Sequence, residues 1–448
     1  MREPLENVSD AYRRYVLGMM TLVYSLGTLD QSIMVLLVEP IKHDLRLTDS
    51  QLGFLTGIAY ALLYGLLGVP VARWSDRGNR ATIAAVAIGL WGITVMACLW
   101  VSNFAQLAVA RTAASIGGSG CMPPTYSLAG DYFPKPAERA RAMAIYWLAG
   151  PLPLVVSFVV GAWLNERYGW RLTLFLVGIP GVLLSFLVKK TVREPRALRH
   201  SPHSPRYVQV DVKILHVAAH LWSQRSARNL SVALLLFYTV AFGLGPWYAA
   251  FMMRSHHVSI SEVGLWLGVI FGSGGSAGVL LGGYIAGRWF AHDERTQMRV
   301  CAASIALMVP CLAAFLLSPV KQLALIALVP FTFVLSFFSG PAYALMQRLV
   351  PEQMRATALA LVMLLANLIG LGLGPQIVGV ASDRLQPLLG DDSLRYAMLL
   401  LSFVALWSAW HFWRVGASVS GDLRSVSGNS STVRDDMKIA NASFDSGI

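Results

Sequence analysis

Twelve long apolar stretches separated by short polar loops make up most of the 448-residue chain. Each is close to the length of about 20 residues that an α-helix needs to cross roughly 30 Å of hydrocarbon. The stretches are continuous and do not alternate with polar residues, so they favour helices over the strands of a β-barrel. The pattern therefore predicts an all-α polytopic membrane protein. The predicted spans are 15–38, 51–72, 81–102, 105–130, 142–164, 171–190, 230–252, 262–286, 299–318, 321–346, 354–381 and 394–414.

The longest internal polar stretch divides the spans into six and six. It is rich in Arg, His, Ser and Pro, and within it residues 215–229 have the pattern of an amphipathic helix lying at a membrane interface. The C-terminal end is rich in Ser, Asn and Asp and lacks an apolar face, which predicts a disordered tail. The predicted division is an N-terminal segment 1–14, a first six-helix bundle 15–190, a linker 191–229, a second six-helix bundle 230–414 and the tail 415–448.

Loops at equivalent places in the two halves resemble each other. The matched arginines lie 211, 214 and 217 residues apart, a nearly constant offset. Internal duplication, with a binding site between pseudo-symmetric bundles near the membrane midplane, is typical of secondary transporters. The matched loops are 72–77 with 286–288, 133–144 with 350–360, and 161–167 with 379–384.

Composition and charge support a membrane protein. Hydrophobic residues make up 55% of the chain and charged residues only 13%, about half of what a soluble domain carries. The net charge of +12 comes mainly from loops on one side, which hold 27 of the 36 Lys and Arg residues, against 8 on the other side. The positive-inside rule then places both termini in the cytoplasm and the spans in the inner (plasma) membrane. No basic groove suited to nucleic acid is visible.

The loop after the second span carries a recognisable motif. Residues 72–80 read ARWSDRGNR, which resembles the G-x-x-x-D-R-x-x-R signature of the major facilitator superfamily, with Ala72 replacing its first glycine. The run REPR at 193–196 also fits. The resemblance implies a charged latch that holds the cytoplasmic side closed, whereas simple positive-inside topology would explain the arginines but not the aspartate. The residues expected to form the latch are Asp76, Arg77, Arg80, Glu138, Arg141 and Arg355.

A narrower resemblance is to the spinster family, on the segments 29–80, 138–146 and 367–383. Members of that family are regarded as exporters of sphingolipids or lysophospholipids, and many are proton-linked. Two departures matter. Gln31 stands where the family pattern has arginine, and Gly118 stands where it has glutamate. The resemblance therefore implies a lipid-like solute but leaves the usual proton route in doubt.

Two ionisable residues lie deep within the predicted spans of the first half. An ionisable group at the bilayer centre costs roughly 2.5–3.5 kcal/mol, so such residues are functional candidates. Asp30 in span one and Arg111 in span four lie at depths that differ by only ~3 Å, at 1.5 Å per residue. We predict that they form a pair across the cavity and carry the proton coupling. The alternative is a static ion pair that only fixes helix packing.

The expected substrate site combines this charge with the second half. Spans seven and eleven carry polar and aromatic side chains but no deep charge, so the cavity suits an amphipathic solute. The residues expected to bind it are Arg111, Tyr238, Trp247 and Asn367. Two alternatives stay open, namely a symporter of small organic anions, with Arg111 as the clamp, and a multidrug/proton antiporter, with Asp30 facing a cation.

Other classes of membrane protein fit less well. An enzyme would need clustered His, Asp, Glu or Ser near one membrane face, and a channel would need a polar pore ring. The sequence shows neither, nor a phosphate-binding loop for ATP. We expect a monomeric transporter with no metal and no cofactor, whose partners are its small-molecule solute, protons and the lipid bilayer.

Overall fold

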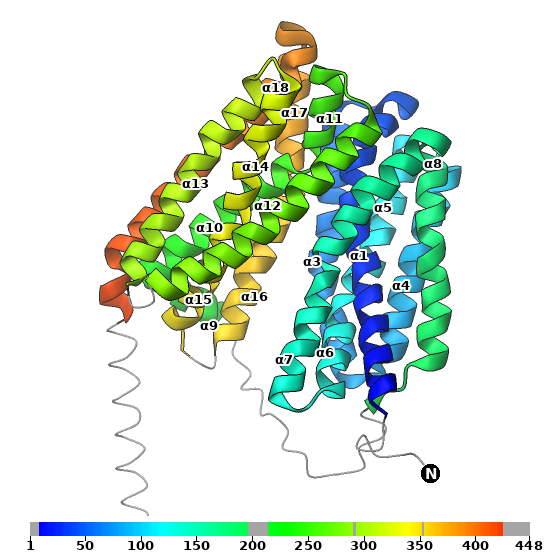
Figure 1. Ribbon diagram of the computed structural model, residues 1–448, viewed down its shortest axis with the longest axis vertical. Helices are drawn as coiled ribbons and strands as arrows, with labels where there is room; N and C mark the ends of the chain where they lie inside the picture. The colour runs from blue at the N-terminus through cyan, green and yellow to red at the C-terminus, as the bar shows by residue number, and fades with distance from the viewer. Residues whose placement is uncertain (1–8, 196–213, 290–292, 352–353, 424–448) are drawn as a thin grey trace, which may run out of the picture.

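A computed structural model describes residues 9–195, 214–289, 293–351 and 354–423, and within these ranges the chain is helical, with short connections and no strand. Figure 1 shows two helical bundles side by side, the first in blue to teal and the second in green to red. We call the face with Asp10, Arg77 and Arg355 the terminal face, and the one with Leu45 and Leu389 the opposite face.

Polar side chains cap four helices of the first bundle. Ser9, Asn79 and Asn103 accept hydrogen bonds from the backbone N–H groups of the following turns, and Thr48 forms a capping box with Gln51. Polar caps at the loops thus set the points at which the apolar runs begin. The main helices are α1 (Asp10–Leu45), α2 (Asp49–Thr56), α3 (Ile58–Arg77), α4 (Arg80–Ala97), α5 (Phe104–Ser119), α6 (Met122–Tyr132), α7 (Pro136–Tyr146) and α8 (Pro151–Thr191).

The second bundle has a similar arrangement of helices. A short helix, α9 (Ile214–Ser223), precedes it and packs against its first long helix. The π-helix η6 (Asn367–Leu373) interrupts the eleventh span and packs against α3 and α10. The other helices are α10 (Arg225–Leu244), α11 (Trp247–His256), α12 (Ile260–Trp289), α13 (Glu294–Leu317), α14 (Lys321–Phe337), α15 (Ser339–Leu349), α16 (Arg355–Ala366), α17 (Gly374–Leu389), α18 (Ser393–Ser402) and a last helix at 404–423.

The twelve predicted spans agree with the helices. Nine helical runs in the described residues are long and apolar enough to cross a membrane, and two of them, Pro153–Thr191 and Thr357–Leu423, each contain two predicted spans. Gly169 separates the fifth and sixth spans inside α8, at a left-handed φ of 75° that favours glycine. The fourth span is divided into α5 and α6. The all-α polytopic membrane fold is confirmed.

The two halves meet at the opposite face and diverge toward the terminal face (Figure 1). There α2 packs against α17, α1 against α11, and α8 against α12. The crossing of α2 and α17 is close because Gly379 has no side chain: a Cβ at this position would lie 2.2 Å from the carbonyl oxygen of Asp49. This conformation is therefore closed at the opposite face.

Two predicted boundaries need correction. Residue 415 does not begin a disordered tail, since the helix 404–423 continues through it and buries Val415 and Val419. Asp422 on this helix accepts a hydrogen bond from the backbone N–H of Ser226 (2.7 Å), which stabilises the start of α10. The second bundle likewise begins at Arg225 and not at residue 230. Residues 1–8, 196–213 and 424–448 of the N-terminal segment, linker and tail lie outside the described residues.

Candidate functional site

A cavity of about 350 Å³ lies between the two halves. Arg111, Gln31 and Ser32 contribute its polar wall from the first half. The facing wall comes from the second half and is aromatic, with Phe237, Tyr238, Phe242, Tyr248 and Phe271. Ligand pockets of about 300–1,000 Å³ typically combine apolar walls with a few polar groups that orient the ligand. The cavity therefore suits a solute with an apolar body and one polar end.

Asp30 and Arg111 are in direct contact at the edge of this cavity. One guanidinium nitrogen, Nη1 of Arg111, lies 2.7 and 2.8 Å from the two carboxylate oxygens of Asp30. Asp30 is 1% exposed and Arg111 3% exposed, yet Arg111 lines the cavity and Asp30 does not. A solute in the cavity therefore meets the cation first, and the carboxylate lies behind it.

The guanidinium of Arg111 also lies over an aromatic ring. Its Cζ is 5.1 Å from the centroid of Tyr60 on α3, a cation–π geometry. A buried ion pair of this kind is costly to assemble, and removing either partner leaves an uncompensated charge in a low-dielectric site. The pair joins α1 to α5, and Tyr60 adds α3 to the same cluster.

Only part of the predicted aromatic site lies at the cavity. Tyr238 lines it, with its hydroxyl hydrogen-bonded to that of Tyr343. Trp247 has no exposed surface, because it is packed inside the second bundle at the start of α11. The amide of Asn367 donates to the carbonyl oxygen of Met363 in its own helix (2.9 Å) and is not among the cavity residues. The structure therefore places Tyr238 at the cavity, but not Trp247 or Asn367.

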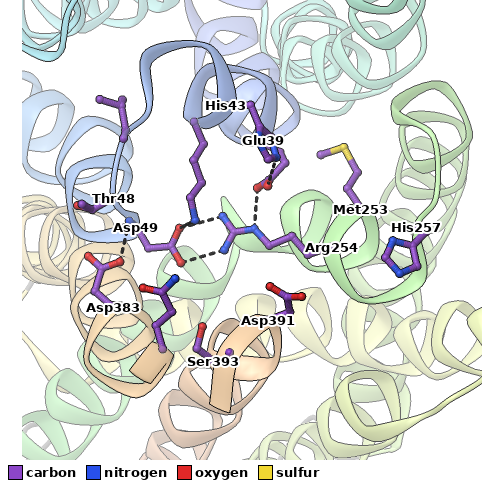
Figure 2. Close-up of a pocket in the computed structure, with 14 residues that line it drawn as sticks. Glu39, His43, Thr48, Asp49, Met253, Arg254, His257, Asp383, Asp391 and Ser393 are labelled. Atoms are coloured by element: carbon purple, nitrogen blue, oxygen red, sulfur yellow. Dashed lines mark hydrogen bonds and ion pairs between the residues drawn. The ribbon is translucent and has the colours of Figure 1, made fainter. Parts of the chain in front are cut away.

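A charge network that the sequence reasoning missed joins the halves at the opposite face. Figure 2 shows Arg254 of α11 between two carboxylates of the first half. Its Nε donates to Glu39 (2.7 Å), and its two terminal nitrogens donate to Asp49 (2.9 Å each). Both acids are more than nine-tenths buried. We call Arg254, Asp49 and Glu39 the interbundle triad.

Neighbouring polar groups complete the surroundings of the triad. Lys42 donates to Asp49 at 2.7 Å, and so does the hydroxyl of Ser382. Asp383, the next residue, accepts from the backbone N–H groups of Asp49 and Ser50 (2.9 and 2.8 Å), so an acid of the second half caps a helix of the first. The sequence offered one signal for this site: acids at 39 and 49 flank the first outer loop.

The predicted latch residues do not join the halves at the terminal face. Arg80 is fully buried, and it pairs with Glu194 and Asp131 of its own half. Glu138 pairs with Lys135 on its own turn (3.3 Å), while Arg77, Arg141 and Arg355 are exposed. The side chain of Asp76 lies outside the described residues. No ion pair in the described part of the chain crosses between the halves at this face, as expected where the bundles diverge.

Arg80 therefore stabilises the first bundle. We expect Arg80→Ala to lower the free energy of unfolding by about 3–5 kcal/mol, because it removes the buried guanidinium that pairs with Glu194 and Asp131. Thermal unfolding of the purified protein in detergent would measure the loss. Arg77→Ala is the matched control: its side chain is exposed and belongs to the same motif, so it should change stability little. Equal losses from both variants would contradict this assignment.

Two helical bundles around a half-polar, half-aromatic cavity define a membrane carrier. The chain belongs to the Major Facilitator Superfamily, whose family model matches residues 18–375. It is 30% identical to an MFS-type efflux pump of Mycolicibacterium smegmatis, over 91% of this chain and 93% of the relative. It is 25% identical to protein spinster homolog 1 of Homo sapiens, over 91% of this chain and 81% of that one.

The fold agrees with a solved relative. The crystal structure of a bacterial homolog to the human lysosomal transporter Spinster, in an inward-facing and unoccupied conformation, superposes with a TM-score of 0.81. It is 25% identical in sequence and covers 93% of this chain and 99% of its own. The predicted resemblance to the spinster family is confirmed, and the protein is a transporter and not an enzyme.

Proposed function

We propose that the protein is a secondary active transporter, linked to protons, that moves an amphipathic or lipid-like solute by alternating access. The observation that carries this proposal is the ion pair of Asp30 and Arg111 at the cavity wall, opposite a wall of aromatic rings. Arg111 attracts the polar or anionic end of the solute, and the rings contact its apolar body. Asp30, behind Arg111, is the group that binds and releases the proton.

Topology and conformation support the direction of opening. The arginine-rich loops support a cytoplasmic location for the terminal face and both termini, with the spans in the inner membrane. With the interbundle triad closed, the structure then represents an inward-facing state. The crystal structure of the bacterial Spinster homolog is also of an inward-facing conformation. An exporter would load its solute from the cytoplasm or inner leaflet in this state, which fits a relative named as an efflux pump.

The positions of Arg111 and Asp30 relative to the cavity help to judge the two alternative functions, an anion symporter and a multidrug/proton antiporter. A symporter of small organic anions would use the same Arg111 as its carboxylate clamp, and it is favoured by the position of Arg111 in front of Asp30. A multidrug/proton antiporter would need Asp30 to face the cation, yet Asp30 is not a cavity residue in this state. The aromatic wall favours the amphipathic solute over a small anion.

Ligand-dependent thermal stabilisation of purified protein separates these substrates. The panel contains lysophospholipids, a sphingoid base, small dicarboxylates and lipophilic cations. A ligand that binds the folded state raises the unfolding temperature by mass action. We expect the anionic lysolipids to stabilise the wild type and to lose this effect in Arg111→Ala. Stabilisation by dicarboxylates alone would identify the anion symporter, and stabilisation by cations alone would identify the antiporter.

Asp30→Asn tests the proton link. We expect the variant to bind solute but to lose the pH dependence of transport, because an amide cannot take up a proton between the two states of the cycle. Transport into proteoliposomes with and without an imposed pH gradient measures this. Asp44→Asn is the matched control, since Asp44 is on the same helix and pairs with Arg171 away from the cavity. An unaltered response to the gradient in Asp30→Asn would rule out Asp30 as the proton site.

A further inference from the structure

Gly118 leaves a space beside the ion pair, and the hydroxyl of Tyr60 fills it. A Cβ added to Gly118 would lie 2.8 Å from Oη of Tyr60 and 3.8 Å from its Cζ. A side chain at position 118 and the hydroxyl at position 60 therefore compete for the same volume. The space beside the ion pair is therefore occupied by a neutral hydroxyl.

One buried donor at this site, Nε of Arg111, has no hydrogen-bond partner. Oη of Tyr60 lies nearby in a residue that is 1% exposed, and its side-chain contact with Gln31 leaves it able to accept a further hydrogen bond. Leaving such a donor unsatisfied is costly. The two are complementary, because a guanidinium Nε–H only donates and a phenol oxygen also accepts. Arg111 already lies over the Tyr60 ring, so both groups belong to the same buried cluster.

The ring of Tyr60 is held from both halves of the protein. Tyr64, one turn further along α3, stacks on it with centroids 5.4 Å apart and planes 22° apart. Leu371 of η6 and Phe242 of α10 pack against the same cluster from the second half. If a change at the ion pair displaced Tyr60, it would therefore also alter the packing between the two bundles.

We propose that Tyr60 is a positioning residue that receives Arg111 when Asp30 is protonated. In the ionised state, Arg111 is bound to the carboxylate of Asp30. Once a proton from the solution binds a carboxylate oxygen of Asp30, the guanidinium keeps its charge and loses its anionic partner. The Nε–H group of Arg111 then donates to Oη of Tyr60, which gives the buried Nε–H an acceptor. This proposal rests on the proposed role of Asp30 in proton coupling.

Few titratable groups surround Asp30 in the described structure. Arg111 of α5 contacts it directly, and Tyr60 of α3 and Cys98, at the end of α4, are close enough to interact with its charge. On the α8 side, the hydroxyl of Ser157 bonds the carbonyl oxygen of Leu29 and carries no charge. The charge on Asp30 is therefore stabilised mainly by Arg111. Any other group that binds the guanidinium of Arg111 competes with Asp30 for it.

Thermal unfolding as a function of pH tests the exchange without any transport substrate. We expect the wild type to show a stability transition where Asp30 titrates, and Asp30→Asn to lack it. Tyr60→Phe keeps the ring but removes the acceptor, so it should destabilise the protonated state alone. The transition should then move to lower pH by about one unit, the value of one hydrogen bond to a charged group.

The controls separate this proposal from the proposed function. Tyr64→Phe removes a hydroxyl from the stacked neighbour and should leave the transition in place. If Asp30→Asn keeps the transition, Asp30 is not the proton site and the proposed coupling fails. If Asp30→Asn removes the transition but Tyr60→Phe leaves it unmoved, the role of Tyr60 alone is overturned.

A double-variant cycle tests the placement of the hydroxyl independently. Gly118→Ala should lower the unfolding temperature of the wild type, because its Cβ would meet Oη at 2.8 Å. In a Tyr60→Phe background the nearest ring atom is 3.8 Å away, so most of that loss should disappear. Gly117→Ala is the control, since its Cβ would meet Trp91 and should cost the same in both backgrounds. Equal losses from Gly118→Ala in both backgrounds would overturn the proposal.

Discussion

Replacement of Arg254 by alanine is expected to open the opposite face of the transporter. The variant leaves the buried carboxylates of Asp49 and Glu39 without the cation that joins them across the two halves. Removing one partner of a buried charge network costs about 3–5 kcal/mol. Because the proposed alternating-access cycle separates the bundles at this face, the loss falls mainly on the closed conformation. The equilibrium should shift toward a conformation open at this face by roughly a hundredfold to a few thousandfold.

Distance measurements between the halves would detect this shift. Spin labels at Tyr168 of α8 and Leu388 of α17, both exposed, should move apart in Arg254→Ala. Arg171→Ala is the matched control, because Arg171 also lies at the opposite face but pairs with Asp44 within the first half. Arg254→Lys should give an intermediate shift, since lysine keeps the charge but loses the forked geometry. Unchanged distances in Arg254→Ala would show that helix packing alone closes this face.

The fold followed from the sequence because lipid leaves a chain few choices. Continuous apolar runs of membrane length must be helices, the longest polar stretch divided them into six and six, and the recurring arginines indicated that the two halves are related. The boundaries failed where polar residues pack. Ser418 and Asp422 looked like residues of a solvated tail, but both bond Ser226 at the start of α10. Such contacts join residues far apart in the chain, so they cannot be predicted from a local sequence pattern.

In the candidate site, too, some residues could be predicted from the sequence and others could not. Asp30 and Arg111 stood out because a charge inside a span is expensive and needs a reason. Arg254 did not, since a charge in an outer loop is inexpensive and topology already explained it. Trp247 was chosen for its residue type and helix, but the face it presents depends on the break between α10 and α11. Tyr60 was overlooked because one hydroxyl matters only beside Gly118, a relationship between two helices.

Arg111→Ala is expected to abolish transport. The variant removes the cation that faces the cavity and leaves the carboxyl group of Asp30 buried without its charged partner. Loss of the anchor for the solute, together with loss of the partner of the proposed proton site, should lower the transport rate by at least about a hundredfold, the equivalent of roughly 3 kcal/mol. Initial rates of uptake into proteoliposomes, normalised to the amount of folded protein, would measure the effect.

The loss must still be distinguished from simple misfolding. In the double variant Asp30→Asn with Arg111→Gln, both side chains keep similar shapes and the buried charges are removed together, so the fold should recover the stability that Arg111→Ala loses. If the pair only fixes helix packing, this neutral variant should also recover transport. If the pair binds the solute and the proton, the variant should be stable and inactive, which is the result we expect. Transport by the neutral double variant would reduce the ion pair to a structural contact between α1 and α5.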